Sequence, residues 1–395
     1  MRRICFCKMG ANIRHRIKNK NLLFSSSPCL LFSLQGFRVI IYLMTLRDAH
    51  NRTIRDLRIS LTDRCNFRCF YCLPNGEPPL ARKETILTFE EIEYISEIFV
   101  SLGIEKIRLT GGEPMLRRSI EDLIAKLARL KIPDSRFKIQ DSEYENPKSK
   151  IQNPKLKDLA LTTNGFSIPQ CAESLKKAGL DRVTISLDSL NRENFRQITG
   201  VDKLDDVLAA IEAAQRADLQ PIKINAVVVR GRNDDELPEF ARFARENDLK
   251  MRFIEFMPLD SGHGWKREQI VSGREIFEKI NAHFPLRLKE NSRGGETAWK
   301  YEFADGAPGE IGIIAPVTQM FCGACSRIRL TADGQIRTCL FSTTEHNLRD
   351  VVRGGASRAE IVEFIKSVVL QKEARHTIND QNFAPASRSM SFIGG

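Results

Sequence analysis

No stretch of this sequence carries enough consecutive apolar residues to cross a bilayer. About 20 are needed, and the most apolar segments near the N-terminus, 30–32 and 39–43, are separated by polar residues such as Ser33 and Arg38. The sequence therefore predicts a protein without a membrane span.

Cysteine is also too scarce for a disulfide scaffold, with ten residues in a chain of 395. Six of the ten fall into two compact groups, Cys65, Cys69 and Cys72, and Cys322, Cys325 and Cys339. Cysteines at such short spacing are more often metal ligands than disulfide partners. This implies a reducing compartment, and we expect the protein to be cytoplasmic.

Acidic residues are absent from residues 1–43, which contain eight lysines and arginines. Subtracting these eight from the net charge of +11 leaves +3 for the remainder of the chain. The body therefore lacks the basic excess typical of a nucleic-acid-binding protein. We expect 1–43 to be a disordered tail or to precede a native start at Met44, with a transit peptide as the alternative.

The rest of the chain alternates strand and helix patterns. Strands are expected at 56–62, 106–110, 158–163, 182–187, 222–229 and 251–256, and helices at 88–102, 119–131, 168–179, 191–198, 204–217 and 235–247. Such alternation predicts a parallel sheet covered by helices. Six strands are too few for an eight-stranded barrel, so we predict an α/β fold with a partial (β/α)6 TIM-type barrel.

The predicted domains follow from where this alternation stops. The barrel spans 44–257, interrupted at 133–157 by a polar, proline-containing insertion that we expect to be disordered. Residues 258–395 lose the alternation, apart from helical patterns near 273–283 and 358–374, and are expected to form a smaller C-terminal domain over the barrel mouth.

The first cysteine group has the spacing C-x3-C-x2-C and directly follows the strand at 56–62. Three thiolates can hold three irons of a [4Fe–4S] cluster and leave the fourth iron open. A structural zinc site is the alternative, but it normally takes four ligands. At the end of the second strand, Gly111-Gly112-Glu113-Pro114 offers backbone carbonyls or a carboxylate to the ammonium group of an amino-acid ligand.

The second group has the spacing Cys322-x2-Cys325-x13-Cys339. It fits either another three-cysteine cluster or a zinc ribbon with His346 as the fourth ligand. Arg327 and Arg329 alternate on an extended segment and so share a face. Together they can clamp a phosphorylated anion; the alternative is a solvated basic surface.

These motifs carry a resemblance to known families. With Tyr71 before its last cysteine, the first group resembles the signature of radical S-adenosylmethionine (SAM) enzymes. The two cysteine groups, the segment 325–330 and the terminal Gly394-Gly395 together resemble the GTP 3′,8-cyclases, the radical SAM family that opens molybdenum cofactor biosynthesis. The resemblance runs from about Met44 to Gly395, excepting the insertion.

The resemblance implies a role for each matching residue. Cys65, Cys69 and Cys72 would hold the cluster that binds SAM, and Tyr71, Gly112, Ser186 and Met257 would line the SAM site. Cys322, Cys325 and Cys339 would hold a second [4Fe–4S] cluster whose open iron meets the guanine. GTP would contact Arg58, Arg108, Thr162, Lys223, Arg327 and Arg329, and Arg58, Arg327, Arg329, Gly394 and Gly395 would be catalytic.

The reaction implied by the resemblance is that of a lyase. A radical derived from SAM removes hydrogen from C3′ of GTP, C3′ bonds to C8 of the guanine, and an electron and a proton complete (8S)-3′,8-cyclo-7,8-dihydroguanosine 5′-triphosphate. The implied partners are a flavodoxin or ferredoxin as electron donor and, downstream, cyclic pyranopterin monophosphate synthase; a homodimer is possible. The alternatives are a radical SAM enzyme that modifies another substrate, such as a peptide, and a non-catalytic zinc or iron–sulfur module.

Overall fold

The computed structural model describes residues 29–34, 37–42, 45–73, 80–132, 155–259, 264–290, 295–385 and 388–394. The expected disorder of 133–157 falls almost entirely outside these ranges, as do Gly395 and most of the basic tail. Residues Met1–Thr45 and Leu46–Gly395 form two separate units. In the first, β1 (Cys29–Leu34) and β2 (Phe37–Tyr42) pair as an antiparallel hairpin.

Six parallel strands form the centre of the second unit, as the alternating pattern predicts. They are β3 (Asp56–Ser60), β4 (Lys106–Thr110), β5 (Asp158–Thr163), β6 (Arg182–Ser186), β7 (Lys223–Val228) and β8 (Lys250–Glu255). Each pairs in parallel with the next in the sequence. This is the partial barrel expected from the sequence, and its strands all end on the same side.

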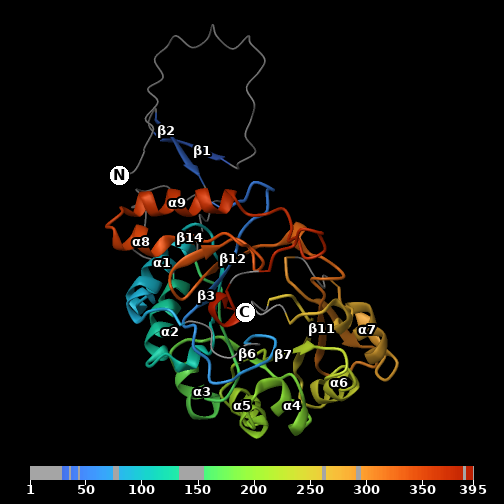
Figure 1. Cartoon of the computed structure of the whole chain (residues 1–395). Helices are drawn as coiled ribbons and strands as arrows, with labels where there is room; N and C mark the ends of the chain where they lie inside the picture. Colours follow the sequence, from blue (N-terminus) through green and yellow to red (C-terminus); the bar gives the residue numbers. More distant parts are fainter. Residues whose placement is uncertain are drawn as a thin grey trace, which may run out of the picture. The chain divides into compact units, whose positions relative to one another are not determined.

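Helices connect these strands and cover the outside of the sheet (Figure 1). They are α1 (Phe89–Ser101), α2 (Ile120–Ala128), α3 (Ile168–Lys177), α4 (Arg192–Thr199), α5 (Leu204–Arg216), α6 (Leu237–Glu246) and α7 (Gly273–Asn281). Helix α1 begins at Thr88, whose hydroxyl accepts from the N–H of Glu91 while the Glu91 carboxylate accepts from the N–H of Thr88. This capping box fixes the helix start that the sequence predicts.

Strands from the C-terminal part extend the sheet at both edges. At one edge β11 (Glu310–Ile314) pairs in parallel with β8, followed by antiparallel β10 (Trp299–Phe303) and β9 (Leu286–Leu288). At the other, β12 (Arg327–Leu330) pairs in parallel with β3, followed by antiparallel β13 (Gln335–Arg337) and β14 (His346–Asn347). The backbone groups of β3 and β8 that would otherwise be unpaired are therefore satisfied.

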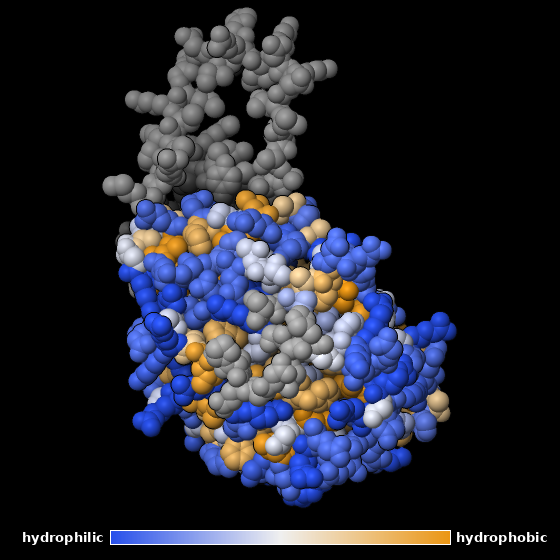
Figure 2. Space-filling view, in the orientation of Figure 1, coloured by the Kyte–Doolittle hydropathy of each residue, from blue (hydrophilic) through white to orange (hydrophobic). Residues whose placement is uncertain are grey.

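The chain ends with α8 (Leu348–Arg353), α9 (Arg358–Leu370) and the one-turn helix α10 (Met390–Ile393). Strand residues such as Leu57, Leu109 and Ile185 are fully buried. The surface seen in Figure 2 is largely hydrophilic at its margins. Within the described ranges, none of the helices is both long and apolar enough to span a membrane.

Candidate active site

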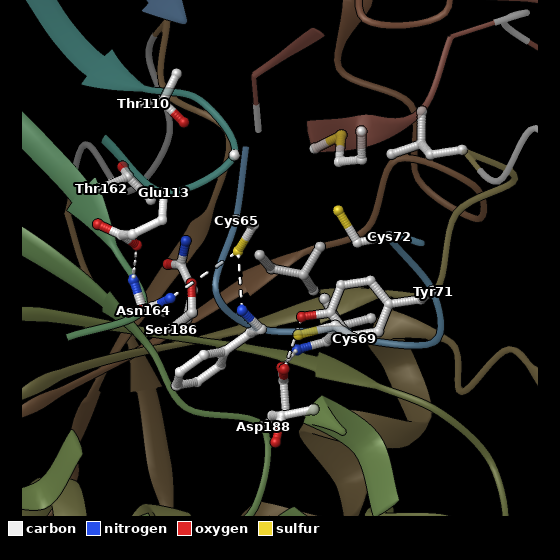
Figure 3. Close-up of a pocket in the computed structure, with 18 of the residues that line it drawn as sticks. Cys65, Cys69, Tyr71, Cys72, Thr110, Glu113, Thr162, Asn164, Ser186 and Asp188 are labelled. Atoms are coloured by element: carbon white, nitrogen blue, oxygen red, sulfur yellow. Dashed lines mark hydrogen bonds between the residues drawn. The ribbon is translucent and has the colours of Figure 1, made fainter. Parts of the chain in front are cut away.

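The loop after β3 carries the first cysteine group, whose three thiols line one cavity of about 190 Å³ (Figure 3). The N–H groups of Cys72 and Leu73 both donate to the Cys69 carbonyl at 2.9 Å, which turns the loop back on itself. Burial raises the pKa of all three thiols, that of Cys72 to about 12. Metal binding would displace their protons, so the loop suits a metal group better than a reactive free thiolate.

Tyr71 is held in place beside these cysteines. Its hydroxyl donates to the Asp188 carboxylate at 2.6 Å, and the same carboxylate accepts from the N–H of Val227 at 2.8 Å. Burial raises the pKa of Asp188 to about 6. Tyr71 therefore lines the cavity in a fixed orientation, together with Gly112, Ser186 and Met257.

The turn after β4 packs tightly against the cysteine loop. The N–H of Gly112 donates to the Thr62 carbonyl at 2.7 Å, and the N–H of Glu113 donates to the Arg64 carbonyl at 2.7 Å. A Cβ atom at Gly112 would lie 2.1 Å from the Arg64 oxygen. Only glycine fits at this position, so the turn and the loop keep one relative placement.

The Glu113 carboxylate is fully engaged within the protein. It accepts hydrogen bonds from the Thr163 hydroxyl at 2.8 Å and from the backbone N–H groups of Asn164 at 2.8 Å and Met115 at 3.0 Å. Burial raises its pKa to about 7. Of the two acceptors that the sequence offered to an ammonium group, the backbone carbonyls of the turn are therefore the better candidates.

The second cysteine group lies in a different electrostatic environment. Cys322, Cys325 and Cys339 line a cavity of about 150 Å³. Although burial opposes ionisation, the charges of Arg327 and Lys372 lower the pKa of Cys325 to about 6. The Arg327 guanidinium donates to Cys325 Sγ at 3.3 Å, and the buried Lys372 ammonium donates to the Arg327 carbonyl at 3.0 Å. Two cations thus stabilise a thiolate here.

Three arginines form a row across adjacent strands beside this group. Arg329 of β12 is the register partner of Arg58 of β3, which is the partner of Arg108 of β4. Register partners of a sheet point to the same face. Burial and the neighbouring arginines lower the pKa of all three. Among the residues that the structure describes, no carboxylate forms an ion pair with this arginine row, although adjacent like charges are destabilising.

A third, larger cavity of about 550 Å³ continues from the second and is strongly basic. Arg58, Arg108 and Arg327 line both cavities. Lys223 lines only the third, where burial and the nearby arginines, Arg252 first among them, lower its pKa to about 6. An anionic ligand would remove the repulsion among these groups.

The first and second cavities meet at a shared wall. Thr162, Asn225, Ile254, Met257 and Met390 line both. Asn225 Oδ1 is buried without a hydrogen-bond partner, so the wall holds an acceptor free for a ligand. The cavities of the two cysteine groups are therefore adjacent.

The donor set fits iron–sulfur clusters better than a single ion. In the described parts of the chain, no three Cys, His, Asp or Glu side chains converge closely enough to bind one common metal ion. A mononuclear zinc site requires such convergence, whereas the irons of a cubic cluster are bound by thiolates that stand farther apart. Three thiols on one cavity wall match the latter arrangement.

Comparison with known proteins places the chain in a family. Residues 59–244 match the Radical SAM superfamily and 249–378 match Molybdenum Cofactor Synthesis C. A GTP 3′,8-cyclase of Streptomyces coelicolor is 40% identical over 364 residues, covering 92% of this chain and 98% of that protein. The chain belongs to the GTP 3′,8-cyclase family. The membership suggested by the two cysteine groups and the terminal glycines is confirmed, and with it the radical SAM class that uses a [4Fe–4S] cluster and SAM.

Solved structures support the fold of this GTP 3′,8-cyclase family member. Streptococcus suis SuiB bound to S-adenosylmethionine superposes with a TM-score of 0.53 at 15% identity, covering 80% of this chain and 69% of SuiB. The anSMEcpe protein with bound AdoMet gives 0.51 at 16% identity over 82% of each chain. The predicted partial barrel is thus confirmed.

The terminal segment of this family member also reaches the site. The Arg329 guanidinium donates a hydrogen bond to the Gly394 carbonyl. Gly394 has φ +80°, and a Cβ there would lie 2.9 Å from Thr110 Cγ2 and 3.1 Å from Ser60 Cβ. The position therefore accepts only glycine. Gly395 lies outside the described residues.

Sequence reasoning missed several residues of the site. Asn225 and Arg252 line the cavities. A sequence signal for Asn225 existed, because it lies two residues after Lys223 on β7 and so shares a face with it. Lys372 and His376 also line the second cavity. They follow α9, Lys372 at the end of the predicted helical pattern and His376 just beyond it, and neither belongs to a motif, so no local signal marked them as site residues.

Proposed function

We propose that this chain converts GTP to (8S)-3′,8-cyclo-7,8-dihydroguanosine 5′-triphosphate, the first step of molybdenum cofactor biosynthesis. The observation that carries the proposal is the arginine row of Arg329, Arg58 and Arg108, which lines the cavity of the second cysteine group, next to the cavity of the first. Buried arginines without carboxylate partners match a triphosphate. A neutral peptide, the alternative substrate, would leave their charge uncompensated.

In this proposal the first cavity holds the radical-generating group. Cys65, Cys69 and Cys72 bind a [4Fe–4S] cluster with one open iron for SAM, and Tyr71, Gly112, Ser186 and Met257 line the SAM site. When bound, this pair supplies a radical that abstracts hydrogen. The backbone carbonyls of the turn after β4 would accept from the ammonium group of SAM, because Glu113 and Asp188 are engaged within the protein.

The second cavity would position the substrate. Cys322, Cys325 and Cys339 hold a second [4Fe–4S] cluster whose open iron meets the guanine, and Arg58, Arg108, Thr162, Lys223, Arg327 and Arg329 contact GTP. Lys223 and Arg252 in the third cavity suit the phosphates, which leaves the ribose near the wall that both cavities share. Met257 and Met390 line this wall, so C3′ would lie next to the cavity proposed for SAM.

Arg58, Arg327 and Arg329 are proposed to be catalytic together with Gly394 and Gly395. Their fixed charges need no reorganisation as the C3′–C8 bond forms. Arg329 binds the Gly394 carbonyl, which links the tail to the arginine row. An electron from a flavodoxin or ferredoxin and a proton would complete the product.

We further propose a barrel at 44–257 with a C-terminal domain at 258–395, transfer of the product to cyclic pyranopterin monophosphate synthase, a homodimer, and a cytoplasmic location without nucleic-acid or membrane partners.

Anaerobic incubation with GTP, SAM and a reductant tests the proposal. We expect cyclised nucleotide and 5′-deoxyadenosine in equal amounts after reconstitution with about eight irons per chain. ATP in place of GTP is the matched control, because it carries the same triphosphate on another base. 5′-Deoxyadenosine without cyclised nucleotide would point to a different substrate, and zinc in place of iron would exclude the radical SAM chemistry.

A further inference from the structure

The last residues of the chain lie in the site through a short helix that needs external support. Helix α10 has four residues, Met390–Ile393, and an isolated helix of one turn is unstable in water. Its end is fixed where Arg329 donates to the Gly394 carbonyl. Met390, the first residue of the helix, lines both cavities. The start of the helix must therefore also be held in place.

Arg388 supplies the contacts at that start. Its Nη1 lies 3.1 and 3.0 Å from the two carboxylate oxygens of Asp333. Its Nη2 lies 3.0 Å from a Glu345 oxygen, and the guanidinium stacks 4.3 Å from the centre of the Phe392 ring. Charge-assisted contacts of this kind are the stronger ones in proteins.

The two carboxylates are themselves held rigidly. Asp333 lies in the turn between β12 and β13 and accepts from the Thr331 hydroxyl at 2.5 Å. Glu345 is bound by the buried Arg337 of β13 at 2.6 Å. Strand β12 carries Arg329, and β13 leads into Cys339. The contacts of Arg388 thus connect the tail to the segment that carries the arginine row and the second cysteine group.

We propose that Arg388 is the positioning residue that seats the C-terminal tail. By binding Asp333 and Glu345, it fixes Met390 at the wall between the cavities and brings Gly394 to Arg329. The effect on turnover rests on the proposed function, whereas the seating itself does not.

Substitution Arg388→Gln tests this in the full-length, reconstituted protein. It removes the charge and the contacts to both carboxylates while keeping a shorter, polar side chain. We expect amide hydrogen exchange in residues 390–394 to become about tenfold faster or more, and kcat for cyclisation to fall by a similar factor. The iron content and the exchange of the barrel strands should not change.

Two further variants separate positioning from general stability. Arg388→Lys keeps the charge but cannot span both carboxylates, so an intermediate loss is expected. Arg358→Gln removes another arginine of the C-terminal region, paired with Glu97 on the surface, and should leave exchange and turnover as they are.

The outcomes are distinct. Unchanged exchange of 390–394 in Arg388→Gln overturns the seating role. Faster exchange with unchanged turnover overturns its functional importance. If the unsubstituted protein yields no cyclised nucleotide, the proposed function fails, but the exchange measurement still decides whether Arg388 seats the tail.

Discussion

The two cysteine groups contain the same type of ligand but differ in the charged residues around them. Around the first, burial and the nearby acids Asp188 and Glu113 outweigh the charge of Arg68, and every thiol pKa is raised. Around the second, burial raises the pKa of Cys339, whereas Arg327 and Lys372 bring the pKa of Cys325 to about 6. Thus the same set of three cysteines does not imply the same chemistry.

The difference matches the charge of the ligand proposed for each cavity. SAM presents a sulfonium and an ammonium group, which acidic surroundings favour, whereas a nucleoside triphosphate needs cations. The same surrounding charges would also act on the cluster proposed at each cysteine group. A cationic environment favours the more reduced, more negative state of a cluster, so the two groups are suited to different partners.

Removing one ligand from each group is the strongest way to separate the two regions. We expect Cys72→Ala to abolish formation of 5′-deoxyadenosine. Cys325→Ala should retain that activity but lose cyclisation, because the first group can still bind SAM. In both variants the iron content should fall from about eight to about four per chain. Iron analysis and chromatographic assay of the two products measure these effects.

Cys171→Ala is the control, since this thiol lies on α3 and bonds only to carbonyls of its own helix and its N-cap residue. It should change neither iron content nor products. If Cys325→Ala also lost 5′-deoxyadenosine formation, the two groups would not be separable and the comparison would fail.

The arginine row predicts a variant with opposite effects on stability and binding. Arg58→Gln removes one of three adjacent, unpaired cations, so the free energy of unfolding of the ligand-free protein should rise by about 1 kcal/mol. The affinity for GTP should fall roughly ten- to hundredfold, because contacts to a charged group are lost. Chemical denaturation and calorimetric titration measure the two quantities.

Arg337→Gln is a matched control in the same register row. Arg337 is the register partner of Arg329 but is paired with Glu345. Its loss should lower the free energy of unfolding by about 2 kcal/mol. If Arg58→Gln also destabilised the protein, the row would not be under electrostatic strain.

The sequence predicted the elements of this fold well, because their signals are local. All six barrel strands lie within the predicted ranges or differ by one residue, as alternating polarity and features such as the Thr88 capping box allow. The positions of Arg58 and Arg329 on strands were likewise expected. Whether each acts in catalysis stays a prediction.

What the sequence did not reveal depends on long-range pairing. No local pattern indicates that β12 joins β3 in the register that brings Arg329 beside Arg58. The same holds for Arg388, which meets Asp333 only after the sheet has formed. Family resemblance supplied the residues proposed to contact GTP, but the arginine row without carboxylate partners became visible only through the register.

The smallest expected effect concerns the protonation of Lys223. Because the pKa of Lys223 in the ligand-free protein is about 6, this side chain is mostly neutral at about pH 7.5, roughly one to two pH units higher. A bound triphosphate would favour the ammonium form and raise this pKa towards its ordinary range. Binding should therefore take up about one proton, and the affinity for GTP should fall up to about tenfold per pH unit above pH 6.

The stability of the ligand-free protein should follow the opposite course. Because the lysine pKa is lower in the folded than in the unfolded chain, the unfolded chain binds more protons between these values, and folding gains stability as pH rises. Calorimetry of GTP binding in buffers of different ionisation enthalpy measures the proton uptake. Lys223→Met should abolish it, whereas Lys250→Met, on the neighbouring strand and lining none of the three cavities, should not. Proton uptake that persists in Lys223→Met would assign the titration to another group and remove Lys223 from the proposed phosphate contacts.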